Sequence, residues 1–285
     1  MLKPELYRLL NYLDGKPRVE ELGLITNGLC IDQEVMKKLS RVSKLKKVKV
    51  SLDGADPEIH DAIRRKGAFE RVLETLSMLI GAETFEVILM LTVMRKNYRN
   101  LPAYLSLMQE VGADGLILER FIPWGRGRER MDQVLSKGEW YDVVKIFSDF
   151  FSAEIDENRL YSFQAFNVKS NKGEMELLGA PCVIGSDGLC VMPEGTLFPC
   201  RRFPVSMGNL SDHSLRQIWE SSELLAALRK RENLKGKCGR CDMEGCRGCR
   251  SLALSLTGDY LAEDPHCWYQ PNAPANIPAD RMSHS

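Results

Sequence analysis

The cysteines of this 285-residue chain are confined almost entirely to one segment. Eight of the nine lie between Cys182 and Cys267, and four of these form two Cys-x2-Cys pairs that are separated by four residues. A Cys-x2-Cys pair places two thiolates on one tight turn, where both can bind one metal centre. Eight soft ligands suffice for two four-thiolate sites, so the segment is predicted to hold either two zinc ions or two iron–sulfur clusters.

Composition narrows the class of protein that carries this segment. Hydrophobic residues make up 44% of the chain, charged residues 27%, and 39 basic side chains balance 39 acidic ones. This balance excludes a disordered chain and gives no electrostatic reason to expect a nucleic-acid partner. No apolar run approaches the roughly 18 residues of a membrane span, and residues 1–20 lack a secretory signal. We therefore expect a cytoplasmic protein without nucleic-acid or membrane partners, whose clustered cysteines bind metal rather than form disulfides. Cys30 stands alone and is expected to be a buried hydrophobic residue.

The first half of the sequence alternates strand and helix patterns. Four short apolar strands are predicted, and helical patterns separate them: Leu22–Thr26, Lys47–Leu52, Phe85–Val93 and Leu116–Phe121. Continuous apolar strands between helices are typical of a parallel sheet in an α/β fold. Each strand ends in a polar or glycine-bearing turn, and the carboxyl ends of such strands carry the site in α/β folds. Ordinary strand-to-helix turns use the same residue types, so this pattern alone leaves both interpretations open.

The amino-terminal strand poses a packing problem. Leu22–Thr26 is apolar, yet residues 1–20 contain one helical pattern and no second strand to pair with it. Either another chain covers this edge of the sheet, or residues are missing before Met1.

The second half is organised around the cysteines. A helix is predicted over Trp140–Glu154, and the rest of 133–180 is poorly patterned. Pro193-Glu194-Gly195 is typical of a hairpin turn and places Cys190 and Cys200 on neighbouring strands, with short helices following. The predicted organisation is an α/β domain over 1–135, a helical linker over 136–180, a cysteine-rich domain over 181–270 and a flexible tail over 271–285.

The cysteine-rich part resembles the SPASM domain of radical S-adenosylmethionine (SAM) enzymes. That family begins Cys-x(9–15)-Gly-x4-Cys, which Cys182, Gly195 and Cys200 match. It continues Cys-x2-Cys-x5-Cys-x3-Cys with a last distant cysteine. This chain has Cys-x2-Cys-x4-Cys-x2-Cys and then Cys267, so each of the last two gaps is one residue shorter.

The first half is similar to the later part of a radical SAM barrel. Ile25-Thr26-Asn27-Gly28 resembles the end of the third strand, and Val50-Ser51-Leu52-Asp53-Gly54 the end of the fourth. Segments ending near Asn97 and Gly125 resemble the fifth and sixth. The resemblance therefore implies a partial (β/α) barrel of radical SAM type that retains strands 3–6, followed by a small SPASM domain with a β-hairpin and short helices. It also implies that Ser51 and Arg64 approach SAM, that the backbone of Ile122 lies near its adenine, and that Asp53 holds the turn.

Two family motifs are not found in this sequence. The Cys-x3-Cys-x2-Cys loop, which binds the cluster that cleaves SAM, is absent, and so is the Gly-Gly-Glu motif that holds the SAM amino group. In relatives both precede the segment that corresponds to Met1. The resemblance thus implies that SAM binds only together with a missing amino-terminal segment.

The resemblance also implies how the eight cysteines divide between two auxiliary [4Fe-4S] clusters. The first would be held by Cys182, Cys190, Cys200 and Cys249. The second would be held by Cys238, Cys241, Cys246 and Cys267. Cys190 lies outside the seven-cysteine signature, and some relatives leave one iron open.

Three functions follow from these observations. The first is a radical SAM/SPASM oxidoreductase or maturase. It would modify a peptide, protein or tetrapyrrole by 5′-deoxyadenosyl radical hydrogen abstraction, with ferredoxin or flavodoxin as electron donor, and it would be inactive without the missing loop. The resemblance favours the heme-biosynthesis branch. The others are a non-catalytic iron–sulfur electron-transfer or scaffold protein, and a zinc-stabilised binding protein. Arg126, Arg128 and Arg130 form either a solvated loop or a contact for a substrate carboxylate.

Overall fold

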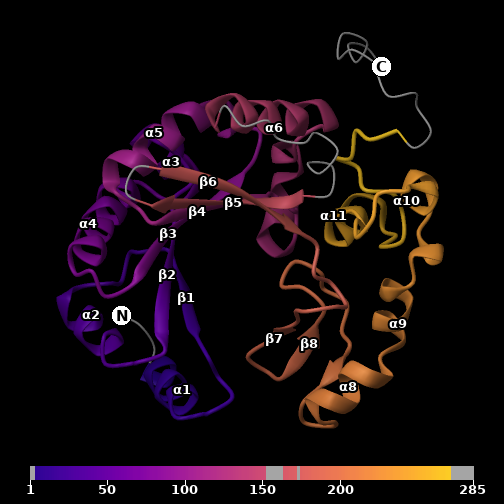
Figure 1. Ribbon diagram of the computed structural model, residues 1–285, viewed down its shortest axis with the longest axis horizontal. Helices are drawn as coiled ribbons and strands as arrows, with labels where there is room; N and C mark the ends of the chain where they lie inside the picture. The colour runs from indigo at the N-terminus through magenta and orange to yellow at the C-terminus, as the bar shows by residue number, and fades with distance from the viewer. Residues whose placement is uncertain (1–3, 152–162, 172–173, 271–285) are drawn as a thin grey trace. The chain divides into compact units, whose positions relative to one another are not determined.

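The computed structural model describes residues 4–151, 163–171 and 174–270. Its main sheet follows the order β1-β2-β3-β4-β5-β6 (Figure 1). The first four strands are parallel, each paired with the next along the chain: β1 (Leu22–Thr26), β2 (Leu45–Ser51), β3 (Glu86–Val93) and β4 (Gly115–Arg120). The predicted parallel α/β sheet is therefore confirmed.

Helices connect these strands, and two of them begin at aspartate N-cap residues. The helices of this part are α1 (Pro4–Asp14), α2 (Gln33–Leu39), α3 (Pro57–Ile63), α4 (Ala68–Gly81) and α5 (Leu101–Val111), with a 3-10 turn η1 (Tyr98–Asn100) before α5. Asp32 accepts the Val35 N–H at 2.8 Å at the start of α2, and Asp56 accepts the Ile59 N–H at 2.9 Å at the start of α3. In Figure 1, α2, α4 and α5 follow one face of the sheet.

Strand β3 lies at the centre of the apolar core. Val87, Leu89 and Val93 are 0% exposed, as are Leu76 and Leu79 of α4. Burying one such side chain contributes about 1.5–3 kcal/mol. The nearly continuous apolar run of β3 is thus explained by its burial on both faces.

The sequence missed two strands within 136–180, which the residue pattern assigned to a helical linker. Helix α6 (Lys137–Phe151) is present, but β5 (Phe163–Asn171) and β6 (Glu174–Pro181) extend the main sheet. Strand β5 runs antiparallel to β4, with Phe166 opposite Leu118, and Phe166 stacks on Phe147 at 5.2 Å between ring centroids. The predicted tail over 271–285 lies outside the described residues.

The chain divides into two compact units. One contains β1–β4 and their helices, and the other contains Phe121–Lys145 and the cysteine-rich part from Ala180 onward. The second unit has a three-stranded antiparallel sheet, β7 (Cys190–Val191), β8 (Thr196–Phe198) and β9 (Gly208–Asn209). Its helical segments are η2 (Gly125–Gln133), α8 (Leu215–Ser221), α9 (Glu223–Arg229), η3 (Arg231–Asn233), α10 (Gly236–Arg240) and α11 (Arg250–Thr257). No helix in the described residues is both long and apolar enough to cross a membrane.

Candidate metal centre

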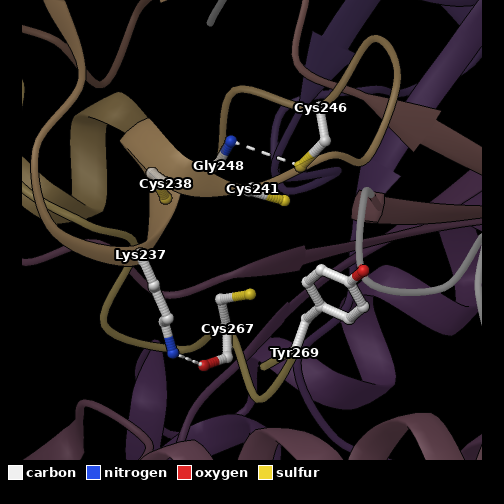
Figure 2. Close-up of a pocket in the computed structure, with 7 residues that line it drawn as sticks. All are labelled: Lys237, Cys238, Cys241, Cys246, Gly248, Cys267 and Tyr269. Carbon is white, nitrogen blue, oxygen red and sulfur yellow. Dashed lines mark hydrogen bonds between the residues drawn. The ribbon is translucent and has the colours of Figure 1, made fainter. Parts of the chain in front are cut away.

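Four cysteines line one pocket of the second unit. Cys238, Cys241, Cys246 and Cys267 surround it together with Lys237, Gly248 and Tyr269 (Figure 2). Helix α10 carries Cys238, and Cys241 ends that helix. The turn that follows presents Cys246, and Cys267 arrives from the segment after Pro265. These are the four residues that the family resemblance implies for the second cluster.

Backbone N–H groups point at the sulfur atoms of this pocket. Met243 N donates to Cys241 Sγ at 3.4 Å, Gly248 N donates to Cys246 Sγ at 3.5 Å, and Asp264 N donates to Cys238 Sγ at 3.4 Å. An N–H donor stabilises the thiolate form of the sulfur that accepts from it. The loop geometry is therefore already arranged for thiolates, the form in which cysteine binds a metal.

Burial acts in the opposite direction on the same thiols. It raises the pKa of Cys267 to about 12, and it raises the pKa of Cys238 and of Cys246 as well. Clustered buried thiols that are held protonated release their protons when a cation binds, so metal binding here is coupled to pH. Soft sulfur donors of this kind fit zinc or an iron–sulfur cluster.

The other four cysteines also come together in the second unit. Strands β7 and β8 pair Cys190 with Phe198, and Cys200 follows β8 in a bridge to Phe203. Cys200 thus lies just past the strand on which the sequence placed it. Burial raises the pKa of Cys182 to about 11, and the thiols of Cys249 and Cys200 nearby raise it further. Burial and the Cys200 thiol likewise raise the pKa of Cys190.

The electrostatic neighbours of the cysteines fall into the same two sets. Besides burial, the pKa of Cys182 is raised by Cys249 and Cys200, and that of Cys190 by Cys200. Besides burial, the pKa of Cys246 is raised by Cys241 and Cys238, and that of Cys267 by Cys238. In the described part of the chain, no three His, Cys, Asp or Glu side chains are positioned as ligands of a single metal ion.

Polar residues gather at the carboxyl ends of β2 and β3 in the first unit. Ser51 ends β2, and the carboxylate of Asp53 follows with only 1% exposure. Asp53 accepts the Thr92 N–H at 3.0 Å and the Arg64 Nε–H at 2.5 Å. The sequence interpretation of Asp53 as a turn residue missed this ion pair, which holds the half-exposed Arg64 side chain at the sheet edge.

Further hydrogen bonds fix the same turn from its buried side. The backbone N–H of Asp53 donates to His60 Nδ1 at 3.0 Å, and Asn97 Nδ2 donates to the Asp53 carbonyl at 2.9 Å. Tyr104 OH donates to the Leu52 carbonyl at 2.9 Å. Side chains from α3, from the β3–η1 turn and from α5 thus fix the loop that follows β2.

The other residues that the sequence singled out, Ile122 and three arginines, belong to the second unit. Ile122 is buried in the second unit, where it clusters with Val134, Cys249 and Leu252. The arginines of the loop that follows β4, Arg126, Arg128 and Arg130, are exposed, and the Arg128 guanidinium lies 4.8 Å from the centroid of the exposed Trp124 ring.

Sequence reasoning missed two buried charged residues of the metal centre, Arg250 and Asp264. Arg250 Nη2 donates to Cys238 Sγ at 3.8 Å, and the Asp264 carboxylate accepts the Cys249 N–H at 2.7 Å. A signal for Arg250 was available in the sequence, because Cys249-Arg250 resembles the residues that flank SPASM cysteines.

Comparison with known proteins identifies the class that this fold and cysteine set define. Residues 1–107 match the radical SAM superfamily, and residues 182–242 match the SPASM family, described as an iron–sulfur cluster-binding domain. The chain belongs to the radical SAM enzymes that carry a SPASM domain.

Relatives of this class share much of the chain. The AdoMet-dependent heme synthase of Methanosarcina barkeri is 32% identical over 292 residues, which cover 95% of this chain and 80% of that protein. Mycofactocin maturase MftC of Mycolicibacterium smegmatis is 31% identical over 267 residues, which cover 88% of this chain and 64% of that protein.

Solved structures show the same fold. Native anSMEcpe with bound AdoMet and Cp18Cys peptide superposes with a TM-score of 0.67 at 20% identity, covering 93% of this chain and 77% of that one. Streptococcus suis SuiB bound to S-adenosylmethionine superposes with a TM-score of 0.65 at 12% identity, covering 93% and 63%.

Proposed function

We propose that this chain is the auxiliary-cluster part of a radical SAM/SPASM oxidoreductase, with one [4Fe-4S] cluster in each of its two four-cysteine sets. The observation that carries the proposal is the convergence of Cys238, Cys241, Cys246 and Cys267 on one pocket (Figure 2). Two cysteines of the other set, Cys182 and Cys200, pack together against one apolar cluster of the same unit. An iron–sulfur cluster bound there would accept or supply single electrons for the reaction.

The residues of the first unit support a role in binding SAM. Ser51 and Arg64 both lie at the carboxyl edge of the sheet, where α/β folds bind their ligands. Asp53 is fixed by Thr92 and holds Arg64, so the guanidinium is directed before a ligand arrives. A directed guanidinium is well suited to a carboxylate such as that of SAM. Because the sequence contains no Cys-x3-Cys-x2-Cys loop, we expect this chain alone not to cleave SAM.

The test begins with the metal content of the chain. We expect anaerobically reconstituted protein to contain about eight iron and eight sulfide per chain and to absorb broadly near 400 nm. Cys182→Ser and Cys238→Ser should each lose about half of the iron, because each removes a ligand of one set. Cys30→Ser is the matched control, since this cysteine lies outside both sets, and the variant should retain its full iron content. Colourless protein with stoichiometric zinc after reconstitution contradicts the proposal.

For the substrate, we favour a tetrapyrrole. The AdoMet-dependent heme synthases of Methanosarcina barkeri and Nitratidesulfovibrio vulgaris are 32% and 28% identical to this chain over 95% of its length, and a Fe-coproporphyrin III synthase is 30% identical. We therefore expect Fe-coproporphyrin III to bind the cluster-loaded chain and to shift its Soret band. An unchanged Soret band contradicts this choice and favours the peptide substrates of the maturase relatives. The electron donor is proposed to be a ferredoxin or flavodoxin, and the location cytoplasmic.

A further inference from the structure

Arg250 is a buried cation next to the metal centre. It is the first residue of α11, directly after Cys249, and only 1% of it is exposed. Its Nη1 donates to the carbonyls of Tyr260 and Ala262 at 3.0 and 2.5 Å. Placing a guanidinium in a protein interior is costly unless other groups compensate its charge. Two carbonyl oxygens supply only part of that compensation.

The second terminal nitrogen of the guanidinium contacts sulfur rather than oxygen. Nη2 donates to Cys238 Sγ at 3.8 Å. Nε is buried and has no hydrogen-bond partner within the described part of the chain. A buried N–H without a partner costs free energy, which an anionic group bound nearby would recover. The guanidinium that contacts a cysteine sulfur through Nη2 therefore keeps one N–H donor, at Nε, that the described residues leave unused.

Arg250 is next to a cysteine of each set. It directly follows Cys249 of the first set at the start of α11, and its Nη2 contacts Cys238 Sγ of the second set at 3.8 Å. In agreement with this placement, the guanidinium lowers the pKa of Cys182 and of Cys238, which burial, the larger influence, raises. Burial is the main cause of the raised pKa of Cys238, Cys246 and Cys267, and the opposing charge of the Asp264 carboxylate raises each of them further.

A glycine at position 248 leaves space for the Arg250 guanidinium. Gly248 has φ +61°, and a Cβ atom there would lie 2.7 Å from Arg250 Nη2 and 2.7 Å from Asp264 Cβ. Any other residue at 248 would therefore displace the charge from its position beside Cys238.

We propose that Arg250 is a positioning residue that raises the reduction potential of both clusters, through its charge at the Cys182 set and its charge plus an N–H···S contact at the Cys238 set. Reduction makes a cluster more negative, so a fixed buried cation favours the reduced state. Net charge and hydrogen bonds to sulfur are the protein's main means of setting such potentials. The inference rests on the proposed function, because it requires a cluster at each set.

The experiment measures potentials rather than turnover. The full chain is reconstituted anaerobically, its iron is counted, and the two clusters are titrated with dithionite under EPR. We expect Arg250→Met to lower both midpoints, so that at the wild-type midpoint the ratio of reduced to oxidised cluster falls at least tenfold, which is about 59 mV for one electron. Arg250→Lys should give an intermediate shift, because it keeps the charge and loses the fork of donors.

Arg229→Met is the matched control. Arg229 is also a partly buried arginine of the second unit that donates to backbone carbonyls, those of Gly185 at 2.8 Å and Trp219 at 3.3 Å, and it contacts no cysteine sulfur by hydrogen bond. It should lower stability and leave both midpoints unchanged. Arg250→Gln, which keeps an N–H donor without the charge, replaces Arg250→Met if the latter does not retain iron.

The outcomes separate the two proposals. Wild-type protein without iron–sulfur clusters contradicts the proposed function itself. Loaded neutral variants with unchanged midpoints, or with the shift that Arg229→Met also gives, overturn the role of Arg250 alone. If neither neutral variant retains iron, Arg250→Lys decides the matter. A lowered midpoint supports the proposal, and wild-type midpoints or loss of iron make Arg250 a purely structural residue.

Discussion

At the scale of single residues, the buried side chain of His60 fixes the turn that follows β2. It is 1% exposed, and its Nδ1 accepts the Asp53 N–H, so this nitrogen must be unprotonated. Burial lowers the pKa of His60 from its ordinary value. The unfolded chain takes up a proton below about pH 6.5, whereas the folded chain does so only at lower pH. The unfolded state therefore binds more protons in this range, and stability is lost as the pH falls.

We predict that the free energy of unfolding falls between pH 7 and pH 5, by at most about 1.4 kcal/mol per pH unit for this one group. Urea denaturation at both pH values measures the fall. His60→Asn keeps an acceptor near the position of Nδ1 and cannot titrate, so it should show a smaller fall. His213→Gln, at an exposed position, should fall as the wild type does. Equal falls in His60→Asn and the wild type would contradict the assignment.

At the scale of elements, the sequence predicted what leaves a local pattern. Strands β1–β4 could be predicted because each is a short apolar run followed by a turn, and α2 and α3 because each begins at an aspartate cap. Strands β5 and β6 were missed because an antiparallel addition to a sheet needs no continuous apolar run, only backbone pairing and alternate buried residues. In β5, Phe166 and Val168 are buried while Lys169 is exposed.

In the metal centre, too, the sequence predicted the features that leave a local pattern and missed those that depend on long-range contacts. The cysteine spacing predicted a metal-binding segment, because a Cys-x2-Cys turn is local in the sequence, whereas the division of the eight cysteines into two sets came from the family resemblance alone. Arg250 and Asp264 were missed because their contacts form only when residues 258–264 fold back over α11, and long-range contact of this kind leaves no spacing in the sequence.

The segment between Cys241 and Cys249 contains a matched pair of glycines. Gly245 and Gly248 both have positive φ, +71° and +61°, but a Cβ at 245 meets nothing within 4 Å whereas one at 248 collides with Arg250 and Asp264. We predict that Gly245→Ala costs about 1 kcal/mol from backbone strain alone. Gly248→Ala should cost more and should also lower the iron content, because it displaces the residues that contact Cys238 and Cys249. Iron analysis and urea denaturation of both variants test this, and equal iron content in the two contradicts it.

At the scale of the whole molecule, each of the two compact units has its own source of stability. The first has a broad apolar core in which Val87, Leu89 and Leu118 are 0% exposed. The second has smaller apolar clusters, and cysteines belong to both of those described: Cys249 to one, and Cys182 and Cys200 to the margin of the other. Stability in the first unit should therefore come from burial of apolar surface, and stability in the second from metal binding.

Removal of iron should thus affect the units unequally. We predict that, after anaerobic chelation of the reconstituted chain, amide hydrogen exchange over 182–270 accelerates at least tenfold, because metal binding to clustered thiolates is coupled to folding. Exchange in β2 and β3 should stay slow, because these strands keep their apolar core and their parallel pairing. Mass spectrometry of peptic fragments before and after chelation measures both effects in one sample. The Cys30→Ser variant serves as a control, since Cys30 lies outside both sets and its removal should change neither result. Equal acceleration in both units would mean that the clusters stabilise the whole chain as one cooperative unit, and unchanged exchange over 182–270 would mean that the cysteine-rich unit folds without metal.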